Sequence, residues 1–356
     1  MTAASITTRL SFGVLVVGLV LTLLASLVWS MTMGPVSIDS RMIMEVVFYK
    51  ITGAGGTAAQ TLLDHPRADI IWNIRLPRVL MAAIVGAGLA LCGVVMQAVV
   101  RNPLANPYIL GISSGAALGA TLAIALGAFG WFGAYGLSVG AFLGAMLASV
   151  LVFAIAFIGQ GGGNTVKLLL AGMAITAVFG AFTSFVIYIA PDSEGIRSIT
   201  FWLMGGLTAA SWRFLPIPTV CVIAGLVLFL TQLRALNALL LGDEAALTLG
   251  VNVTLLRKCY LLVVSLITGA LVAVSGTIGF VGLIIPHIVR MIVGVDHRKV
   301  VLLSALLGAI FLVLCDILAK TLLARGEMPI GIITAMLGGP FFIWLLLTKS
   351  YGFGEN

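Results

Sequence analysis

Ten apolar runs, separated by short polar segments, follow one another along the chain. A helix needs about 20 mostly apolar residues to cross the hydrocarbon core of a membrane, so each run predicts one membrane-spanning helix. The pattern predicts an all-α polytopic membrane protein with about ten transmembrane helices, in which residues 1–356 form a single transmembrane domain. The runs lie near Leu10–Ser30, Val79–Val100, Leu110–Leu126, Tyr135–Ile158, Leu168–Ala190, Leu215–Leu233, Leu255–Val274, Ile278–Val295, Val300–Leu323 and Ile330–Leu347.

The composition agrees with a membrane location. Hydrophobic residues make up 61% of the chain and charged residues only 9%, whereas about a quarter of the residues in soluble domains are charged. The net charge of +7 is not gathered in a basic tract, so membrane lipid, and not nucleic acid, is the expected partner of these charges. The four cysteines stand singly inside apolar runs, without the paired spacing of a metal site, and we assign no metal ligand.

Small residues recur at every fourth position in two neighbouring apolar runs. Such ridges let helix backbones approach closely, because packing drives the association of helices in lipid. The pattern predicts a compact bundle and requires no transport role of these residues. The two ridges are Gly111, Gly115, Gly119, Ala123 and Gly127, followed by Gly136, Gly140, Gly144 and Ala148.

Two arginines stand where the second helix is expected to begin. The segment "IRLPRVL" places Arg75 and Arg78 around Pro77, a residue typical of the first helical turn. A helix start carries a partial positive charge, so basic residues there are unfavourable. If both chain ends are cytoplasmic, ten of the 19 basic residues lie inside and nine outside, which is a poor positive-inside signal. The basic residues outside, to which these two arginines belong, therefore need another reason, and we expect both side chains to point to the outer surface.

A proline-broken turn follows the second apolar run, in the segment "RNPLANP". Prolines remove backbone donors and disfavour helix at the residue before them, so the chain must turn here. Two interpretations stay open: a tight cytoplasmic turn, or irregular backbone lining a water-filled pathway.

The segment "LLGDEAALTLGVNV", at about residues 241–253, predicts a short amphipathic helix outside the bilayer. Asp243 can cap this helix, Glu244 lies in its first turn, Ala246, Leu247 and Leu249 form its apolar face, and Gly250 ends it. The alternatives are a surface loop resting on lipid headgroups and a helix that docks into a cytoplasmic partner. The two acidic residues favour the partner, because the cytoplasmic leaflet is anionic.

One acidic residue lies deep in the ninth apolar run. Asp316 precedes Lys320 by four residues, so the two side chains can pair across one helical turn. An ionisable residue within a membrane helix indicates function by default. Structural pairing and a proton relay both remain open.

Six motifs follow one another between about Arg75 and Leu347: "IRLPRVL", "GLALCGVVMQAVVRNPLANPYILGISSGA", "FWLMGGL", "GDEAALTLGVN", "GTIGFVGLIIPHIVR" and "CDILAKTLLARGEMPIGIITAMLGGPFFIWLLL". In this order they resemble the permease subunits of type II ABC importers for iron complexes, haem and cobalamin, the FecCD family. The resemblance implies a dimer, expected to be a homodimer, of ten-helix permease subunits in the inner membrane. It also implies two cytoplasmic ATPase subunits and a periplasmic substrate-binding protein.

The resemblance assigns roles to particular residues. Arg75, Arg78 and Lys320 match basic positions at the outer mouth that pair with acids of the binding protein, although arginine is usual at the position of Lys320. Arg197 lies in a segment similar to the external gate and is a candidate ligand contact. The cytoplasmic gate is expected at Asn102, Leu104, Asn164 and Thr165. The ATPase coupling helix is expected at Gly242, Asp243, Glu244, Ala245, Ala246, Leu247, Leu249 and Gly250.

The expected function is import of a ferric siderophore or haem, with cobalamin third. The sequence lacks the G-x-x-x-x-G-K-[ST] phosphate loop, so we expect no enzyme activity and no cofactor in this chain, with ATP and Mg²⁺ bound by the partner ATPase. The alternatives are an ion-coupled secondary transporter, which needs intramembrane acids, and a polytopic membrane enzyme, for which no catalytic set is apparent.

Overall fold

The computed structural model of the chain describes residues 12–53, 62–158, 165–323 and 326–348, and all regular secondary structure in these ranges is helical. Each of the ten predicted runs coincides with one helix, which confirms the all-α fold. These helices are α2 (Phe12–Thr32), α6 (Leu76–Val100), α7 (Ile112–Leu126), α8 (Gly136–Phe157), α9 (Thr165–Tyr188), α11 (Pro216–Thr231), α14 (Val253–Ser275), α15 (Val281–Val293), α16 (His297–Thr321) and α17 (Ile330–Thr348).

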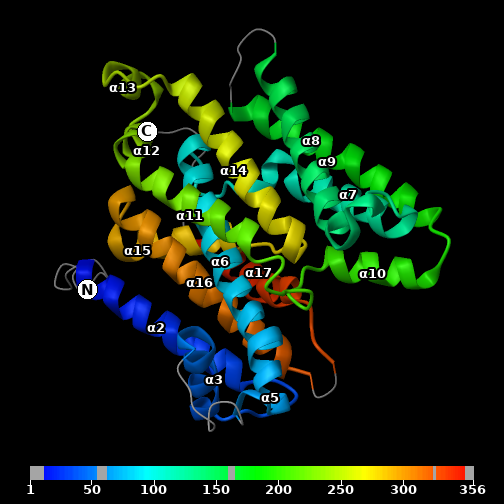
Figure 1. Cartoon of the computed structure of the whole chain (residues 1–356). Coiled ribbons are helices and arrows are strands. Elements are labelled where there is room, and N and C mark those ends of the chain that lie inside the picture. Colours follow the sequence, from blue (N-terminus) through cyan, green and yellow to red (C-terminus); the bar gives the residue numbers. More distant parts are fainter. Residues whose placement is uncertain (1–11, 54–61, 159–164, 324–325, 349–356) are drawn as a thin grey trace.

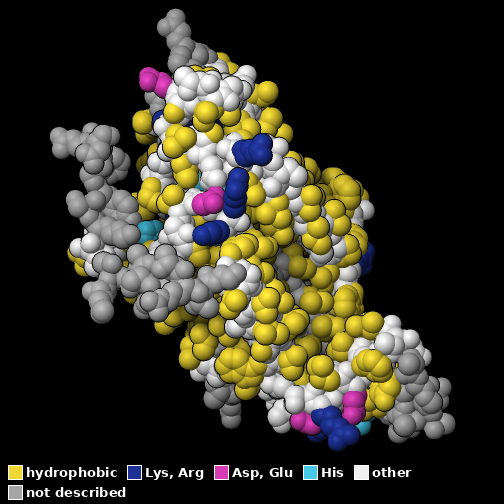
Figure 2. Space-filling model, turned by 90° about the vertical axis from the view of Figure 1, so that its left-hand side faces the viewer, with side chains coloured by type: hydrophobic (Ala, Val, Ile, Leu, Met, Phe, Trp, Pro, Cys, Tyr) yellow, Lys and Arg dark blue, Asp and Glu magenta, His cyan; other side chains and the backbone are white. Residues whose placement is uncertain are grey.

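The apolar helices differ in length. Seven helical runs in the described ranges are long and apolar enough to cross a membrane, and α11 with α12 (Leu233–Leu240) forms an eighth span bent by 68°. Helices α7 and α15 are apolar but shorter. Figure 2 shows two groups of charged side chains, one in the upper part of this face and one at its lower end, with hydrophobic side chains between them. This arrangement fits a protein that spans a bilayer.

Short helices mark the two ends of the bundle. Helices α12 and α13 (Asp243–Thr248) lie at one end, and α3 (Ser40–Thr52) and α5 (Pro66–Asp69) lie at the opposite end (Figure 1). We call these the α13 end and the α5 end. The remaining short elements are α10 (Ser193–Leu203) and the 3-10 turns η2 (Pro107–Leu110) and η3 (Gly130–Tyr135).

The second span does not begin at Pro77. Helix α5, the π-helical turn η1 (Ile70–Arg75) and α6 form one helical run of 35 residues. The backbone N–H of Leu76 donates to the carbonyl of Ile71, five residues earlier, and this wider turn accommodates a proline, which lacks a donor of its own. Arg75 and Arg78 therefore lie inside a helix, and the interpretation based on the charge of a helix start is wrong.

Helix α6 is the central element of the bundle. It contacts α16, α14, α15 and α11, and most of its residues are buried. Glycines bring its backbone against its neighbours: a Cβ atom at Gly86 would lie 2.2 Å from the carbonyl oxygen of Gly308, and one at Gly93 would lie 1.9 Å from that of Gly282. Because no side chain fits at these crossings, α15 and α16 are fixed directly against α6.

The two predicted small-residue ridges pack against each other, as helices α7 and α8. A Cβ atom at Gly115 would lie 2.2 Å from the carbonyl oxygen of Gly144, and one at Gly119 would lie 2.0 Å from that of Gly140. This confirms the prediction of close helix packing.

We expect Gly119→Ala to destabilise the protein by about 1–3 kcal/mol, because the added methyl group must push α8 away from α7. The matched control is Gly18→Ala on α2, where a Cβ atom meets nothing within 4 Å. Thermal unfolding in detergent measures both variants. Equal transition temperatures for the two variants would contradict the packing argument.

Candidate functional site

A cluster of four charged side chains lies near the α5 end. The Arg78 Nε atom lies 2.9 Å from Asp316 Oδ1, and its Nη1 atom lies 2.7 Å from Glu327 Oε2. Lys320 forms an ion pair with Asp316 and donates to Ser30 Oγ at 3.4 Å. The cluster holds two positive and two negative charges, so it is neutral overall. The predicted pairing of Asp316 with Lys320 is confirmed.

The cluster is almost closed to solvent. The side chain of Asp316 is 0% exposed, those of Lys320 and Arg78 are 5% and 10% exposed, and that of Glu327 is 30% exposed. A buried charge is tolerated only when it is paired and hydrogen-bonded. Glu327 is thus the member of the cluster that solvent reaches most easily.

Arg75 is also buried, and its guanidinium donates to the backbone carbonyls of Met31 and Val36. These carbonyls lie at the end of α2 and in the connection to α3, so Arg75 fixes this connection against η1. The expectation that Arg75 and Arg78 point to the outer surface is wrong. Both guanidinium groups turn inward because carbonyls and carboxylates of this chain supply the acceptors that a charge inside the membrane requires.

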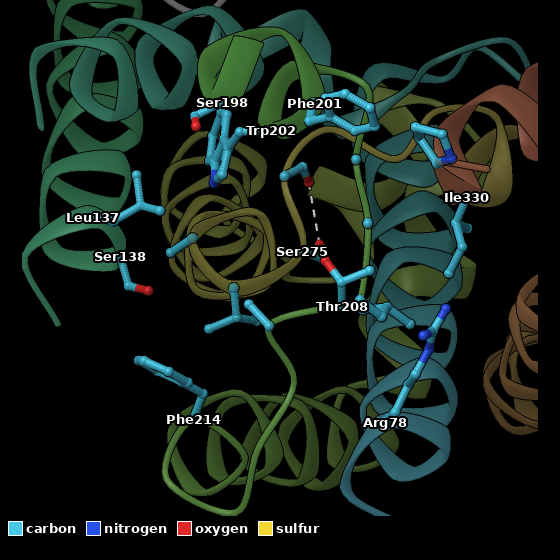
Figure 3. A pocket seen from close by; sticks show the side chains of 18 of the residues that line it. Arg78, Leu137, Ser138, Ser198, Phe201, Trp202, Thr208, Phe214, Ser275 and Ile330 are labelled. Carbon is cyan, nitrogen blue, oxygen red and sulfur yellow. Dashed lines mark hydrogen bonds between the residues drawn. The ribbon is translucent and has the colours of Figure 1, made fainter. Parts of the chain in front are cut away.

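A cavity of about 650 Å³ adjoins the cluster. Arg78 and Glu327 line one part of it, and Ser198 and Trp202 of α10 line another (Figure 3). Arg197 is not among the lining residues; it is exposed, and its guanidinium lies 5.7 Å from the centre of the Phe201 ring. Its role as a ligand contact stays a prediction. The cavity combines an ion pair with aromatic and hydroxyl groups, so it can bind a ligand that carries both polar and apolar parts.

The proline-broken turn at the α13 end is tight and locally satisfied. Arg101 adopts a left-handed conformation at φ 51°, and the backbone N–H of Asn102 donates to the Gln97 carbonyl at 3.2 Å. The side chain of Asn102 accepts from the N–H of Leu104 at 2.8 Å. Of the other two predicted gate residues, Asn164 lies outside the described residues and Thr165 begins α9.

The predicted amphipathic helix is present as α13. Ala246 is buried, Leu247 and Leu249 are 59% and 63% exposed, and Gly250 ends the helix at φ 80°. One detail is wrong: Asp243 is the first helical residue after the N-cap Gly242, and it makes no capping hydrogen bond. Its carboxylate turns instead toward the guanidinium of Arg257, at 2.9 and 3.1 Å.

Sequence reasoning missed two arginines at the α13 end. Arg257 lies in the first turns of α14 and binds Asp243. Arg290 donates to the side chain of Gln97, whose amide donates to the carbonyls of Gly282 and Leu283 at 3.4 and 3.3 Å. The lone glutamine in the apolar run of α6 is the signal that could have indicated this second contact.

A polar cluster joins α12 to α16 at the same end. The Asn237 side chain donates to Asp296 Oδ1 at 2.8 Å and accepts from the backbone N–H of His297 at 2.9 Å. The backbone N–H of Arg298 and the Asn237 amide, which both donate to Asp296, hold the pKa of its carboxyl below its usual value. The ionised carboxylate thereby fixes the start of α16.

Comparison with known proteins gives a consistent result. A model of the FecCD transport family matches residues 21–348. The hemin transport system permease protein HmuU of Yersinia pestis is 44% identical over 303 residues, which cover 83% of this chain and 90% of that protein. The iron(3+)-hydroxamate import system permease protein FhuB of Bacillus subtilis is 38% identical, over 95% of this chain and 84% of that protein.

A solved structure is similar as well. It is described as an inward-facing conformation of a metal-chelate type ABC transporter, and it matches with a TM-score of 0.79 and 36% identity. The match covers 94% of this chain and 99% of that one. The helices described above are therefore arranged as in an ABC transporter permease.

Removal of the buried carboxylate in Asp316→Asn should cost about 3–5 kcal/mol of stability, because it leaves two buried cations with one acid. The control is Glu45→Gln, which breaks the i,i+4 pair between Glu45 and Arg41. The side chain of Arg41 is 84% exposed and that of Glu45 is 39% exposed. Such an exposed pair contributes only about 0–1 kcal/mol. Thermal unfolding of both variants in detergent tests this difference, and similar losses would show that the buried cluster is not a stability determinant.

Proposed function

The chain belongs to the FecCD transport family, and on this premise we propose that it is the permease subunit of an ATP-driven importer that moves an iron complex across the inner membrane. The observation that carries the proposal is the family match over residues 21–348, together with relatives that are named as permeases for hemin and for iron(3+)-hydroxamate. The apolar helices make the chain a multi-pass membrane protein, and we assign it to the inner membrane.

A ferric siderophore or haem is the proposed cargo, with cobalamin third. The relatives that are named as hemin and iron(3+)-hydroxamate permeases support an iron complex as cargo. A further relative, from Halobacterium salinarum, is named as a cobalamin import permease. It is 44% identical, over 79% of this chain and 74% of its own length. These cargoes share an apolar frame with polar or charged groups on it. The cavity beside Arg78 offers both kinds of contact.

The energy for transport is proposed to come from two cytoplasmic ATPase subunits that bind ATP and Mg²⁺, since the sequence has no phosphate loop. We assign the α13 end to the cytoplasm and α13 to the ATPase contact. Leu247 and Leu249 support this assignment, because they are large apolar side chains exposed on a helix that begins with two acids. A second copy of this chain would complete a homodimeric permease.

The gate and docking assignments remain proposals. Asn102 and Leu104 lie in the turn that follows α6 at the α13 end, where a cytoplasmic gate is expected with Asn164 and Thr165. Arg78 and Lys320 lie toward the opposite end, where a binding protein would dock. Since these side chains and Arg75 are already bound within the chain, an acid of the binding protein would have to replace an internal partner such as Glu327.

Transport by purified protein in liposomes tests the proposal. With the ATPase subunits, the binding protein and ATP inside, we expect uptake of ferric siderophore or haem; without the ATPase, or with a proton gradient alone, we expect none. Uptake driven by a proton gradient in the absence of ATPase would establish a secondary transporter and overturn the proposal.

Leu247→Asp should abolish association with the ATPase and leave membrane insertion intact, because it places a charge on the exposed apolar face of α13. Leu255→Asp is the control, since Leu255 is equally exposed, at 59%, in the first turn of the neighbouring α14. Co-purification on a tagged ATPase measures the effect. Equal retention of both variants would show that α13 is not the contact.

A further inference from the structure

One guanidinium joins the coupling helix to the central helix of the bundle. Arg257, in the first turns of α14, donates through Nη1 and Nη2 to the two carboxylate oxygens of Asp243, at 3.1 and 2.9 Å. Its Nε atom donates to the backbone carbonyl of Val99 at 3.1 Å. The side chain of Arg257 is 11% exposed and that of Asp243 is 37% exposed, so the guanidinium is better shielded from solvent than the carboxylate. Three of its donor atoms are thus divided between α13 and α6.

Both acceptors lie at helix ends. Val99 is in the last turn of α6, where backbone carbonyls lack a partner within the helix. Asp243 is in the first turn of α13, where a negative charge is favoured by the helix dipole. Arg257 therefore satisfies the end of one helix and the beginning of the other at the same time.

The α6 contact lies directly before the proline-broken turn. Two residues after Val99, the chain turns through the left-handed Arg101, and the next residues are Asn102 and Leu104. The guanidinium of Arg101 also approaches Asp243, at 3.7 Å, but its side chain is 44% exposed, and such an exposed pair contributes little. The firm connection from Asp243 to the turn accordingly runs through Arg257.

Helix α13 has few other attachments to the bundle. It is six residues long, and its one buried residue is Ala246. Leu247 and Leu249 face away from the bundle. A force applied to these exposed side chains can reach the bundle through the chain itself, which continues into α12 and α14, through the packing of Ala246, or through the paired Asp243 carboxylate. Of these routes, the carboxylate is the one directed at the end of α6.

We propose that Arg257 is a positioning residue that transmits displacement of α13 to the turn at Asn102 and Leu104. The proposal rests on the proposed function, in which α13 contacts the ATPase and this turn belongs to the gate. A planar guanidinium can hold the carboxylate with two donors and the carbonyl with a third. When α13 moves, Asp243 moves Arg257, and Arg257 moves the last turn of α6.

The test uses Arg257→Lys, Asp243→Asn and the double variant in the reconstituted importer. Lysine keeps the charge at position 257 but cannot hold both acceptors in the same way. In Arg257→Lys we expect the ATPase to remain bound and ATP hydrolysis to persist. In all three variants we expect the substrate imported per ATP to fall about tenfold, which corresponds to the loss of one charge-assisted contact. The double variant should lose no more than either single variant, because the two residues act through one contact. Arg234→Lys, an exposed arginine of α12, is the matched control and should leave the ratio unchanged.

A labelling measurement separates transmission from a merely structural role. In a Leu104→Cys background, the thiol should label at different rates in nucleotide-free and ATP-trapped importer, and Arg257→Lys should remove this difference while the thermal unfolding temperature stays near that of the parent. Unchanged import per ATP in the variants, or loss of the ATPase from Arg257→Lys, would overturn the inference. If the parent protein itself shows no ATP-dependent import, the proposed function fails instead.

Discussion

A charge buried inside a protein must be paired and hydrogen-bonded, and this constraint determines how the α5 end is built. Arg78 and Lys320 are held by Asp316 and Glu327 in a cluster without net charge. Its members come from α6, from α16 and from the segment before α17, with Ser30 of α2 at the edge. Neutralisation thus joins α6 to two carboxylates that lie 238 and 249 residues away in sequence.

Helix α6 carries this order through the bundle. Its backbone touches α16 at Gly86 and α15 at Gly93, so it cannot slide past either neighbour without a clash. Arg78 anchors it near one end, and Arg257 holds the carbonyl of Val99 at the other. A rigid helix with polar contacts near both ends can transmit a displacement from one side of a membrane to the other. The glycine contacts in its middle part keep α15 and α16 from moving independently of it.

The sequence predicted the features that depend on local spacing along the chain. It missed the contacts between residues that are far apart in sequence. The apolar runs, the ridges of α7 and α8 and the i,i+4 pair of Asp316 and Lys320 are local patterns, and all are present. The start of the second span was wrong because a π-helical turn absorbs Pro77. The burial of Arg78 could not be foreseen, since its acids lie 238 and 249 residues away. Asp243 was predicted to cap α13 because it stands at the start of the helix. Its actual partner, Arg257, lies in the next helix and could not be identified from local spacing.

The same pairing bears on how transport is driven. An ion-coupled transporter needs an intramembrane acid that gains and loses its ion or proton during the cycle. Asp316 is fully buried, and it is held between Arg78 and Lys320. Two cations of this chain thus engage the carboxylate, which favours a structural role for Asp316 over a coupling site. At the α13 end, in contrast, Leu247 and Leu249 are exposed. The first carboxylate of α13, that of Asp243, is connected to the end of α6 through Arg257. The charged residues of this chain therefore connect α13 to the end of α6 at one end of the bundle, and hold α6, α16 and the segment before α17 together at the other.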